Sequence, residues 1–154
     1  SLDFGVIGSG QCGGRLAKGF YDIGYKKVIA LNTAVADLNP LDIPANQKLR
    51  IGSLEGSGKS MEKGGKAAEE SAQAIFDKMK SAFGTVDKVI ICVGFGGGTG
   101  AGSCPVLISI ARKYLEFIGN VNPKQNIIIV AALPTAGELK SVVVNKNNEE
   151  VKSS

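Results

Sequence analysis

The residues best suited to do chemistry lie in one glycine-rich run, Gly94 to Gly102, which reads GFGGGTGAG. An apolar segment, Val89 to Val93, precedes it, and apolar residues at helical spacing follow it from Leu107 to Ile118. A strand, a glycine turn and a helix in that order point unpaired N–H groups and the positive end of the helix dipole at an anion. The hydroxyl of Thr99 adds a donor for a phosphate oxygen or a metal-bound water. We therefore expect a phosphate site here rather than a flexible linker.

A second glycine turn, Gly8 to Gly14, follows a predicted strand over Leu2 to Ile7 and precedes a predicted helix that ends near Gly24. Its letters fit G-x-G-x-x-G, the dinucleotide fingerprint. A typical NAD site also has an acidic residue at the end of the next strand, where it holds the ribose hydroxyls. Asn32 stands at that position. An NAD(P)-dependent oxidoreductase on a Rossmann fold is therefore the alternative to a phosphate-binding nucleotide site and not the preferred interpretation.

A third glycine-rich stretch, Gly52 to Ser60, ends in Gly-Lys-Ser like a Walker A motif. That motif needs a glycine five residues before its Gly-Lys pair, and Ser53 occupies this position. We predict a flexible loop close to a terminal phosphate instead of a Walker site.

Composition narrows the class of protein. The chain has 154 residues, 44% of them hydrophobic, which is enough to bury one core. It contains no histidine, and this excludes Ser-His, Cys-His and His-metal chemistry. The net charge is +4, but the lysines and arginines are scattered among the acidic residues and not gathered in a stripe. We therefore expect nucleic acid to be at most an indirect partner. No segment is long enough to cross a membrane.

Three cysteines, Cys12, Cys92 and Cys104, lack the spacing of a metal site. Their odd number and apolar surroundings predict reduced thiols in the cytoplasm.

Alternating apolar runs and helical patterns predict an α/β fold, a Rossmann-like doubly wound parallel sheet with helices on both faces. One helix is predicted over Gly65 to Phe83, and a second helix has Pro105 in its first turn. The connection over Asn32 to Gln47 is expected to be rich in loops, because it contains two prolines. Strands are predicted at 2–7, 27–31, 48–51, 89–93 and 126–133. Ligands of such sheets bind at the carboxyl ends of the strands.

The residues Gly96 to Gly102 resemble the signature phosphate loop of the tubulin and FtsZ superfamily of GTPases. The turn at Gly10 to Gly13 is similar to the first nucleotide loop of β-tubulin, and Asn32 with Thr33 resembles the FtsZ loop after its second strand. Pro134 with Glu138 on the following loop resembles the FtsZ loop whose glutamate contacts the ribose. The stretch Leu54 to Gly56 is most similar to the plasmid- and phage-encoded branch, TubZ. The resemblance covers essentially the whole chain.

The resemblance implies a site for GTP or GDP with Mg²⁺. The N–H groups of one set of residues would hold the α and β phosphates: Gly10, Gln11, Cys12 and Gly13. Those of a second set would hold the β and γ phosphates: Gly97, Gly98, Thr99 and Gly100. Gln11 would lie close to the metal, Glu55 in the loop that senses the γ-phosphate, and Glu138 at the ribose; Asn32 and Pro134 belong to the surrounding loops. For Glu55 and Glu138 a solvated carboxylate is the alternative. For Cys12 and Cys104 we expect plain packing of the thiols and no redox role.

Two features depart from the family. FtsZ has an arginine four residues after the ribose glutamate, and this chain has Val142 there; Lys140 cannot make the same forked contact. The elements that grip the base and the acidic loop that completes the neighbouring subunit's site come later in the family. We expect residues 1–141 to form the GTP-binding domain and residues 142–154 to be the frayed start of a truncated helix.

The resemblance implies a prokaryotic polymerising GTPase, a hydrolase of the cytoskeleton that forms head-to-tail homopolymers. Its filaments would serve plasmid partition, phage DNA positioning or cell division. Water would be oriented by acids of the adjacent subunit, so we expect no catalytic residue within this chain. A non-catalytic assembly module that keeps the fold without binding nucleotide is a third interpretation.

Overall fold

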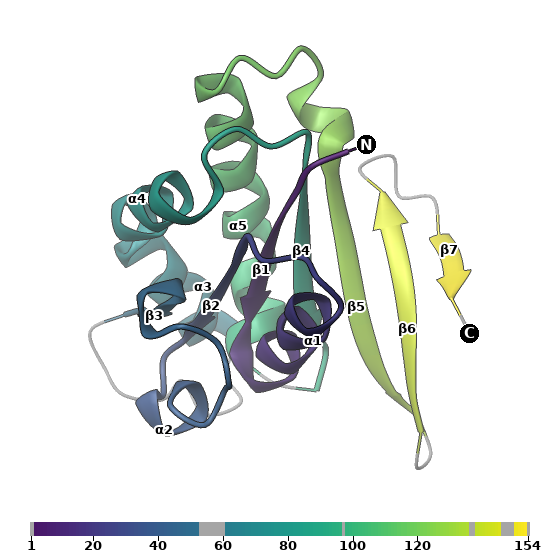
Figure 1. The fold of residues 1–154 in the computed structure, drawn as a ribbon. Helices are drawn as coiled ribbons and strands as arrows, with labels where there is room; N and C mark the ends of the chain where they lie inside the picture. Colours follow the sequence, from purple (N-terminus) through teal and green to yellow (C-terminus); the bar gives the residue numbers. More distant parts are fainter. Residues whose placement is uncertain (1, 53–60, 97, 136–137, 146–149, 154) are drawn as a thin grey trace.

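The computed structural model describes residues 2–52, 61–96, 98–135, 138–145 and 150–153, and the side chains of residues 2–52, 62–96 and 98–133. Within these ranges the strands form one sheet in the order β3-β2-β1-β4-β5-β6-β7 (Figure 1). The strands are β1 Phe4–Ser9, β2 Val28–Asn32, β3 Lys48–Arg50, β4 Lys88–Gly94, β5 Ile127–Thr135, β6 Glu138–Asn145 and β7 Glu150–Ser153.

The first five strands are parallel, and each pairs with its neighbours in that order. Helices α1 (Gly10–Asp22) and α2 (Val35–Leu38) cover one face of the sheet. Helices α3 (Met61–Glu70), α4 (Ala72–Phe83) and α5 (Gly98–Phe117) cover the other, as Figure 1 shows. The predicted Rossmann-like sheet with helices on both faces is confirmed.

Alternation along the central strands divides the core in two. Ile7, Ile29 and Ile91 are level with one another in β1, β2 and β4, are fully buried, and face α3, α4 and α5. Their sequence neighbours Val6 and Val28 pack on the other face against α1. Each such side chain contributes about 1.5–3 kcal/mol when it is buried. The middle residues of these three strands are therefore apolar on both faces, as expected for a sheet that is covered on both sides.

Helix α5 begins earlier than the sequence predicts. It starts at Gly98, so Pro105 is its eighth residue and the prediction that Pro105 lies in the first turn is wrong. Glycine disfavours a helix interior, which is why the sequence indicated a turn. In the structure this first turn is packed between other backbones, and tertiary contacts override the local preference.

The predicted helix over Gly65 to Phe83 is divided into α3 and α4 at Ser71. The hydroxyl of Ser71 accepts a hydrogen bond from the N–H of Gly52, at 2.9 Å. This bond ties the junction of the two helices to the chain that leaves β3. The loop-rich connection over residues 32–47 holds two short helical segments, α2 and the 3-10 turn η1 Ala45–Gln47; a second 3-10 turn, η2 Pro123–Asn126, precedes β5.

The helix predicted over residues 142–154 is wrong in the stretches that the structure describes, 142–145 and 150–153, which are strands. The strand β6 runs antiparallel to β5 across residue 141, the expected end of the domain, and β7 runs antiparallel to β6. The run Val142 to Val144 favours this outcome, because β-branched residues have a lower helix propensity and a higher strand propensity.

Candidate functional site at the carboxyl edge of the sheet

The carboxyl ends of the parallel strands lie together at the lower edge of the sheet in Figure 1. There β1 passes into α1 at Gly10, β2 ends at Asn32 and β4 ends at Gly94, shortly before α5. Five polar side chains are buried among those that the structure describes, and all five belong to this edge: Ser9, Asn32, Thr33, Thr99 and Ser103. Elsewhere the described core is apolar, so polar groups are concentrated where ligands of such sheets bind.

The two predicted phosphate turns touch each other through backbone. Gly10 has φ +80°, a conformation that suits glycine, and turns the chain from β1 into α1. A Cβ on Gly10 would lie 2.9 Å from the backbone nitrogen of Gly100, in the first turn of α5. Two helix N-termini from distant parts of the sequence therefore meet at one point.

The first turn of α1 contains the first set of predicted ligands, Gly10 to Gly13. N–H groups of a first turn have no partner inside their helix. Among the described residues no side chain caps α1, although Ser9 precedes it with extended backbone, φ −121° and ψ 132°. The end of α1 is thus open to an anion. Gln11 is exposed, and Gly13 is buried against β4, where a Cβ would meet the carbonyl oxygen of Cys92.

Two buried hydroxyl contacts join the loops at this edge. Ser9 Oγ lies 2.7 Å from Ser103 Oγ, and Ser103 Oγ donates to the carbonyl oxygen of Gly100 at 3.0 Å. Thr33 Oγ1 lies 3.2 Å from Thr99 Oγ1. The sequence analysis missed Ser9 and Ser103, because a serine in an apolar helix or at the end of a strand carries no pattern that marks it.

Asn32 shapes its own loop. Its Oδ1 accepts a hydrogen bond from the N–H of Ala34 at 3.2 Å, the pattern of an Asx turn. With its side chain 4% exposed, Asn32 fixes the path of the chain between β2 and α2, directly before Thr33.

Helix α3 packs closely on the first turn of α5, and the sequence analysis missed this contact too. A Cβ on Gly64 would meet the carbonyl oxygen of Gly98 and would lie 2.7 Å from Cα of Thr99; one on Gly65 would lie 2.9 Å from the carbonyl oxygen of Gly102. The available signal was the glycine pair in an otherwise helical pattern, which marks a close approach of backbones.

The cysteines lie in different environments. Cys12 is half-buried in the first turn of α1, and burial raises the pKa of its thiol while the charge of Arg15 acts in the opposite direction. Cys92 and Cys104 are buried, and burial raises the pKa of their thiols to about 12 and about 11. All three are free thiols.

Some predicted site residues lie at the limits of the described structure. Glu55 and Gly97 are outside the described residues, as is the stretch Leu54 to Gly56. Pro134 lies in β5 and not in a loop, and Glu138 is the first residue of β6, paired with Thr135 at the end of β5. Glu138 was expected on a loop, and that is wrong; its backbone is still at the carboxyl edge of the sheet.

In the described ranges, no three His, Cys, Asp or Glu residues are grouped so that they could hold a metal ion. No helix found there is long and apolar enough to cross a membrane.

Comparison with known proteins identifies the family. The sequence profile of the Tubulin/FtsZ family, GTPase domain, matches residues 4–150. The chain belongs to the Tubulin/FtsZ family. The resemblance to this family that the sequence indicated is confirmed.

Relatives within the Tubulin/FtsZ family support the assignment. The tubulin-like protein CetZ of Pyrococcus abyssi (strain GE5 / Orsay) is 34% identical over 140 residues, which cover 86% of this chain and 36% of that protein. The structure of CetZ1 from Haloferax volcanii as a GDP-bound monomer has a TM-score of 0.68 at 30% identity, and covers 89% of this chain and 43% of that one. An FtsZ dimer from M. jannaschii has a TM-score of 0.60 at 32% identity, over 79% of this chain and 34% of that one.

The chain spans about a third of the length of the curated relatives it matches. Structures of TubZ are also similar, at 23–26% identity. The narrower resemblance to TubZ rests on Leu54 to Gly56, outside the described residues, so the subfamily stays a prediction.

Proposed function

We propose that this chain is the nucleotide-binding part of a Tubulin/FtsZ-type GTPase, and that it binds GTP and GDP at the carboxyl edge of its sheet. The observation that carries the proposal is the contact between Gly10 and Gly100, which brings the uncapped N-terminus of α1 together with the first turn of α5. One helix N-terminus attracts an anion modestly, and two that converge suit the extended charge of a diphosphate. The relative CetZ1, solved with GDP, supports this choice of ligand.

Each group has a proposed role. The N–H groups of Gly10 to Gly13 hold the α and β phosphates, and those of Gly97 to Gly100 hold the β and γ phosphates. For Thr99 we assign the N–H and not the hydroxyl, because the hydroxyl is buried beside Thr33. The remaining residues keep the roles that the family implies. Glu55 lies at the γ-phosphate and Asn32 in the loop after β2. Glu138, with Pro134 before it, lies at the ribose.

Magnesium fits this site only as a companion of the nucleotide. The described residues offer no cluster of three metal-binding side chains, whereas Mg²⁺ in proteins often takes its ligands from phosphate oxygens and water. The exposed amide of Gln11, in the first turn of α1, is the group that would contact the metal or its water. We expect Gln11→Ala to reduce the gain in GTP affinity on adding magnesium; an unchanged gain would remove Gln11 from the metal site.

GTP hydrolysis and assembly are proposed for the longer protein. We assign no catalytic residue to this chain, and infer that a neighbouring copy completes the site in a head-to-tail filament. The FtsZ dimer among the relatives supports self-association. A head-to-tail interface that does not close produces a filament. Whether the filament serves plasmid partition, phage DNA positioning or cell division is open. The free thiols agree with a cytoplasmic location.

Equilibrium binding tests the nucleotide site. A fluorescent GTP analogue with Mg²⁺ is titrated into the chain and competed separately by GTP, ATP and NAD. We expect GTP to compete and NAD to fail. In Gly100→Ala a Cβ would lie 2.8 Å from the carbonyl oxygen of Ser9, which is backbone, so binding should weaken about tenfold or more.

The matched control is Gly19→Ala, a helical glycine of α1 where a Cβ would meet nothing within 4 Å. It should bind like the unmodified chain. Competition by NAD alone would contradict the proposal, and absence of binding to every variant would favour a non-catalytic assembly module.

A further inference from the structure

Besides the backbone contact between the two phosphate turns, one side-chain connection joins them. Ser9 is the last residue of β1 and precedes Gly10, and Ser103 lies in the second turn of α5. Both side chains are 0% exposed, and their hydroxyl oxygens are 2.7 Å apart. The bond links positions 94 residues apart in the sequence.

The direction of this bond follows from its neighbour. Ser103 donates its single hydroxyl proton to the carbonyl oxygen of Gly100, at 3.0 Å. A serine hydroxyl has one proton and two lone pairs, so Ser103 accepts and Ser9 donates. The result is a relay from Ser9 through Ser103 to the carbonyl of Gly100.

The two ends of the relay bracket the contact between the turns. One end is the residue before Gly10, and the other is Gly100 itself, whose nitrogen would lie 2.9 Å from a Cβ on Gly10. A glycine-to-glycine contact is not directional, since it consists of dispersion between small groups. The hydroxyl relay is directional, and burial keeps water from replacing it.

The relay also keeps the Ser9 hydroxyl away from the helix. Serine is a preferred N-cap residue, and a capping hydroxyl accepts from the N–H groups of the first turn. In the described structure no side chain caps α1. The Ser9 oxygen lies beside Ser103 and makes no such cap, so the first-turn N–H groups remain available to a ligand.

We propose that Ser9 and Ser103 are positioning residues, which hold the N-termini of α1 and α5 at the spacing that one diphosphate group needs in order to contact both. This inference rests on the proposed nucleotide site. Neither serine touches the nucleotide, because both side chains are fully buried. They act on affinity through the position of Gly100 relative to Gly10.

A double-mutant cycle with GDP tests the proposal. Ser9→Ala and Ser103→Ala each break the relay, so each should weaken GDP binding by about five- to tenfold. The double variant should be no weaker than either single one, since the shared connection is lost only once. Losses that multiply in the double variant, or singles that bind like the unmodified chain, would overturn the proposal.

The matched control is Ser81→Ala. The Ser81 hydroxyl donates at 3.0 Å to the carbonyl of Lys78, three residues earlier in α4, just as Ser103 does to Gly100 in α5. It lies far from the site in α4, so GDP affinity should not change.

Urea unfolding without nucleotide separates the effect of the hydrogen bond on stability from its effect on GDP affinity. The Ser9 and Ser103 variants should show non-additive stability, which reports the hydrogen bond alone. GDP affinity is then compared well below the unfolding transition, where every variant is folded, so a general loss of stability cannot lower it. If the unmodified chain fails to bind GDP, the proposed function fails and this role with it; if it binds and the cycle is additive, only the positioning role fails.

Discussion

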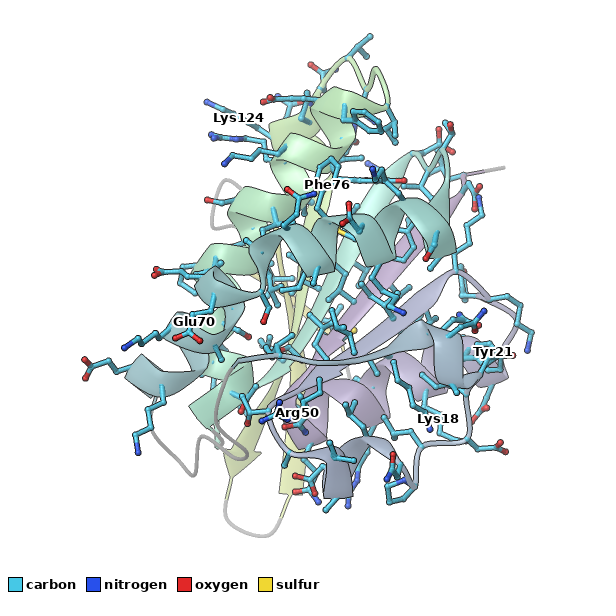
Figure 2. All side chains as sticks on the ribbon, turned by 90° about the vertical axis from the view of Figure 1, so that its left-hand side faces the viewer. Lys18, Tyr21, Arg50, Glu70, Phe76 and Lys124 are labelled. Carbon is cyan, nitrogen blue, oxygen red and sulfur yellow. The ribbon has the colours of Figure 1, made fainter. Side chains whose placement is uncertain are left out.

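The two ends of α5 differ in the size of the residues that pack there. Its first turn, Gly98 to Gly102, consists of small residues and is contacted by the backbones of Gly10 and Gly64. Its last turns contain Tyr114 and Phe117, whose rings contact Phe76 of α4; Figure 2 shows Phe76 where these helices pack. One end is formed by backbone brought close together, and the other by large side chains.

The difference fits the anion site that we propose at the first turn and the stabilising role of the packed end. Binding an anion requires N–H groups that nothing covers, so side chains must be absent. Stability requires buried apolar area, so large side chains must be present. A single helix joins the two because it is rigid enough to be anchored at one end and to present its N-terminus at the other. Stability and ligand affinity should therefore respond to different substitutions.

Tyr114→Ala is the largest expected effect, and it tests the packed end. Tyr114 is 1% exposed, has ring contacts with Phe76, Phe83 and Phe117, and donates its hydroxyl to the carbonyl of Gly84. Its removal should cost about 3–5 kcal/mol in urea unfolding. Nucleotide affinity of the fraction that stays folded should not change.

Phe117→Ala is the control at the same end. Phe117 is 63% exposed, so its removal should cost less than about 1 kcal/mol. Equal losses for Tyr114 and Phe117 would show that burial does not govern this end of the helix.

Gly64→Ala tests the first turn of α5, where we propose that the nucleotide binds; we call it the ligand end. The added Cβ would meet the carbonyl oxygen of Gly98, so the first turn of α5 must shift. We expect a loss of about 1–3 kcal/mol in stability and a clear loss of nucleotide affinity. If affinity is retained at reduced stability, α3 packs on this turn without positioning it.

The buried thiol of Cys104, in the second turn of α5, makes stability depend on pH. Unfolded, this thiol loses its proton near pH 9, whereas burial holds the folded pKa at about 11. Between these values the unfolded state binds fewer protons, so stability falls as the pH rises, by about 1.4 kcal/mol per pH unit. The stability contributed by this shift is fully present below pH 9. Thermal unfolding of the unmodified chain and of Cys104→Ala across this range should show the steeper decline in the unmodified chain; parallel curves would place Cys104 in contact with solvent.

Gly19→Ala has the smallest expected effect, and it should raise the stability instead of lowering it. This helical glycine has nothing within 4 Å of a Cβ, so alanine should stabilise the protein by about 0.4–1 kcal/mol. Calorimetry on Gly19→Ala beside Gly64→Ala then compares two helical glycines that differ only in what surrounds them. A destabilised Gly19→Ala would mean that glycine content itself, and not contact between backbones, explains the ligand end.

Local chemistry was sufficient to predict much of the molecule. Apolar runs predicted the buried parallel strands of the sheet, and the two glycine turns were predicted to bind phosphate. Predictions failed where a segment's conformation depends on its neighbours. The start of α5 at Gly98 is stabilised by packing against α3, and Glu138 lies in a strand because β6 pairs with β5. Helical and extended states of such segments are close in local energy, so contacts distant in the sequence decide between them.

The sequence by itself determined the fold class, the family and the two turns that we propose bind phosphate, because strand burial and glycine spacing are properties of contiguous residues. Only the tertiary structure decided that Gly10 meets Gly100, that the hydroxyls of Ser9 and Ser103 meet and that Gly64 packs on the first turn of α5. These contacts join residues up to 94 positions apart in the sequence. No periodicity records them, since each depends on how the strands are ordered in the sheet and on which helices lie on the same face.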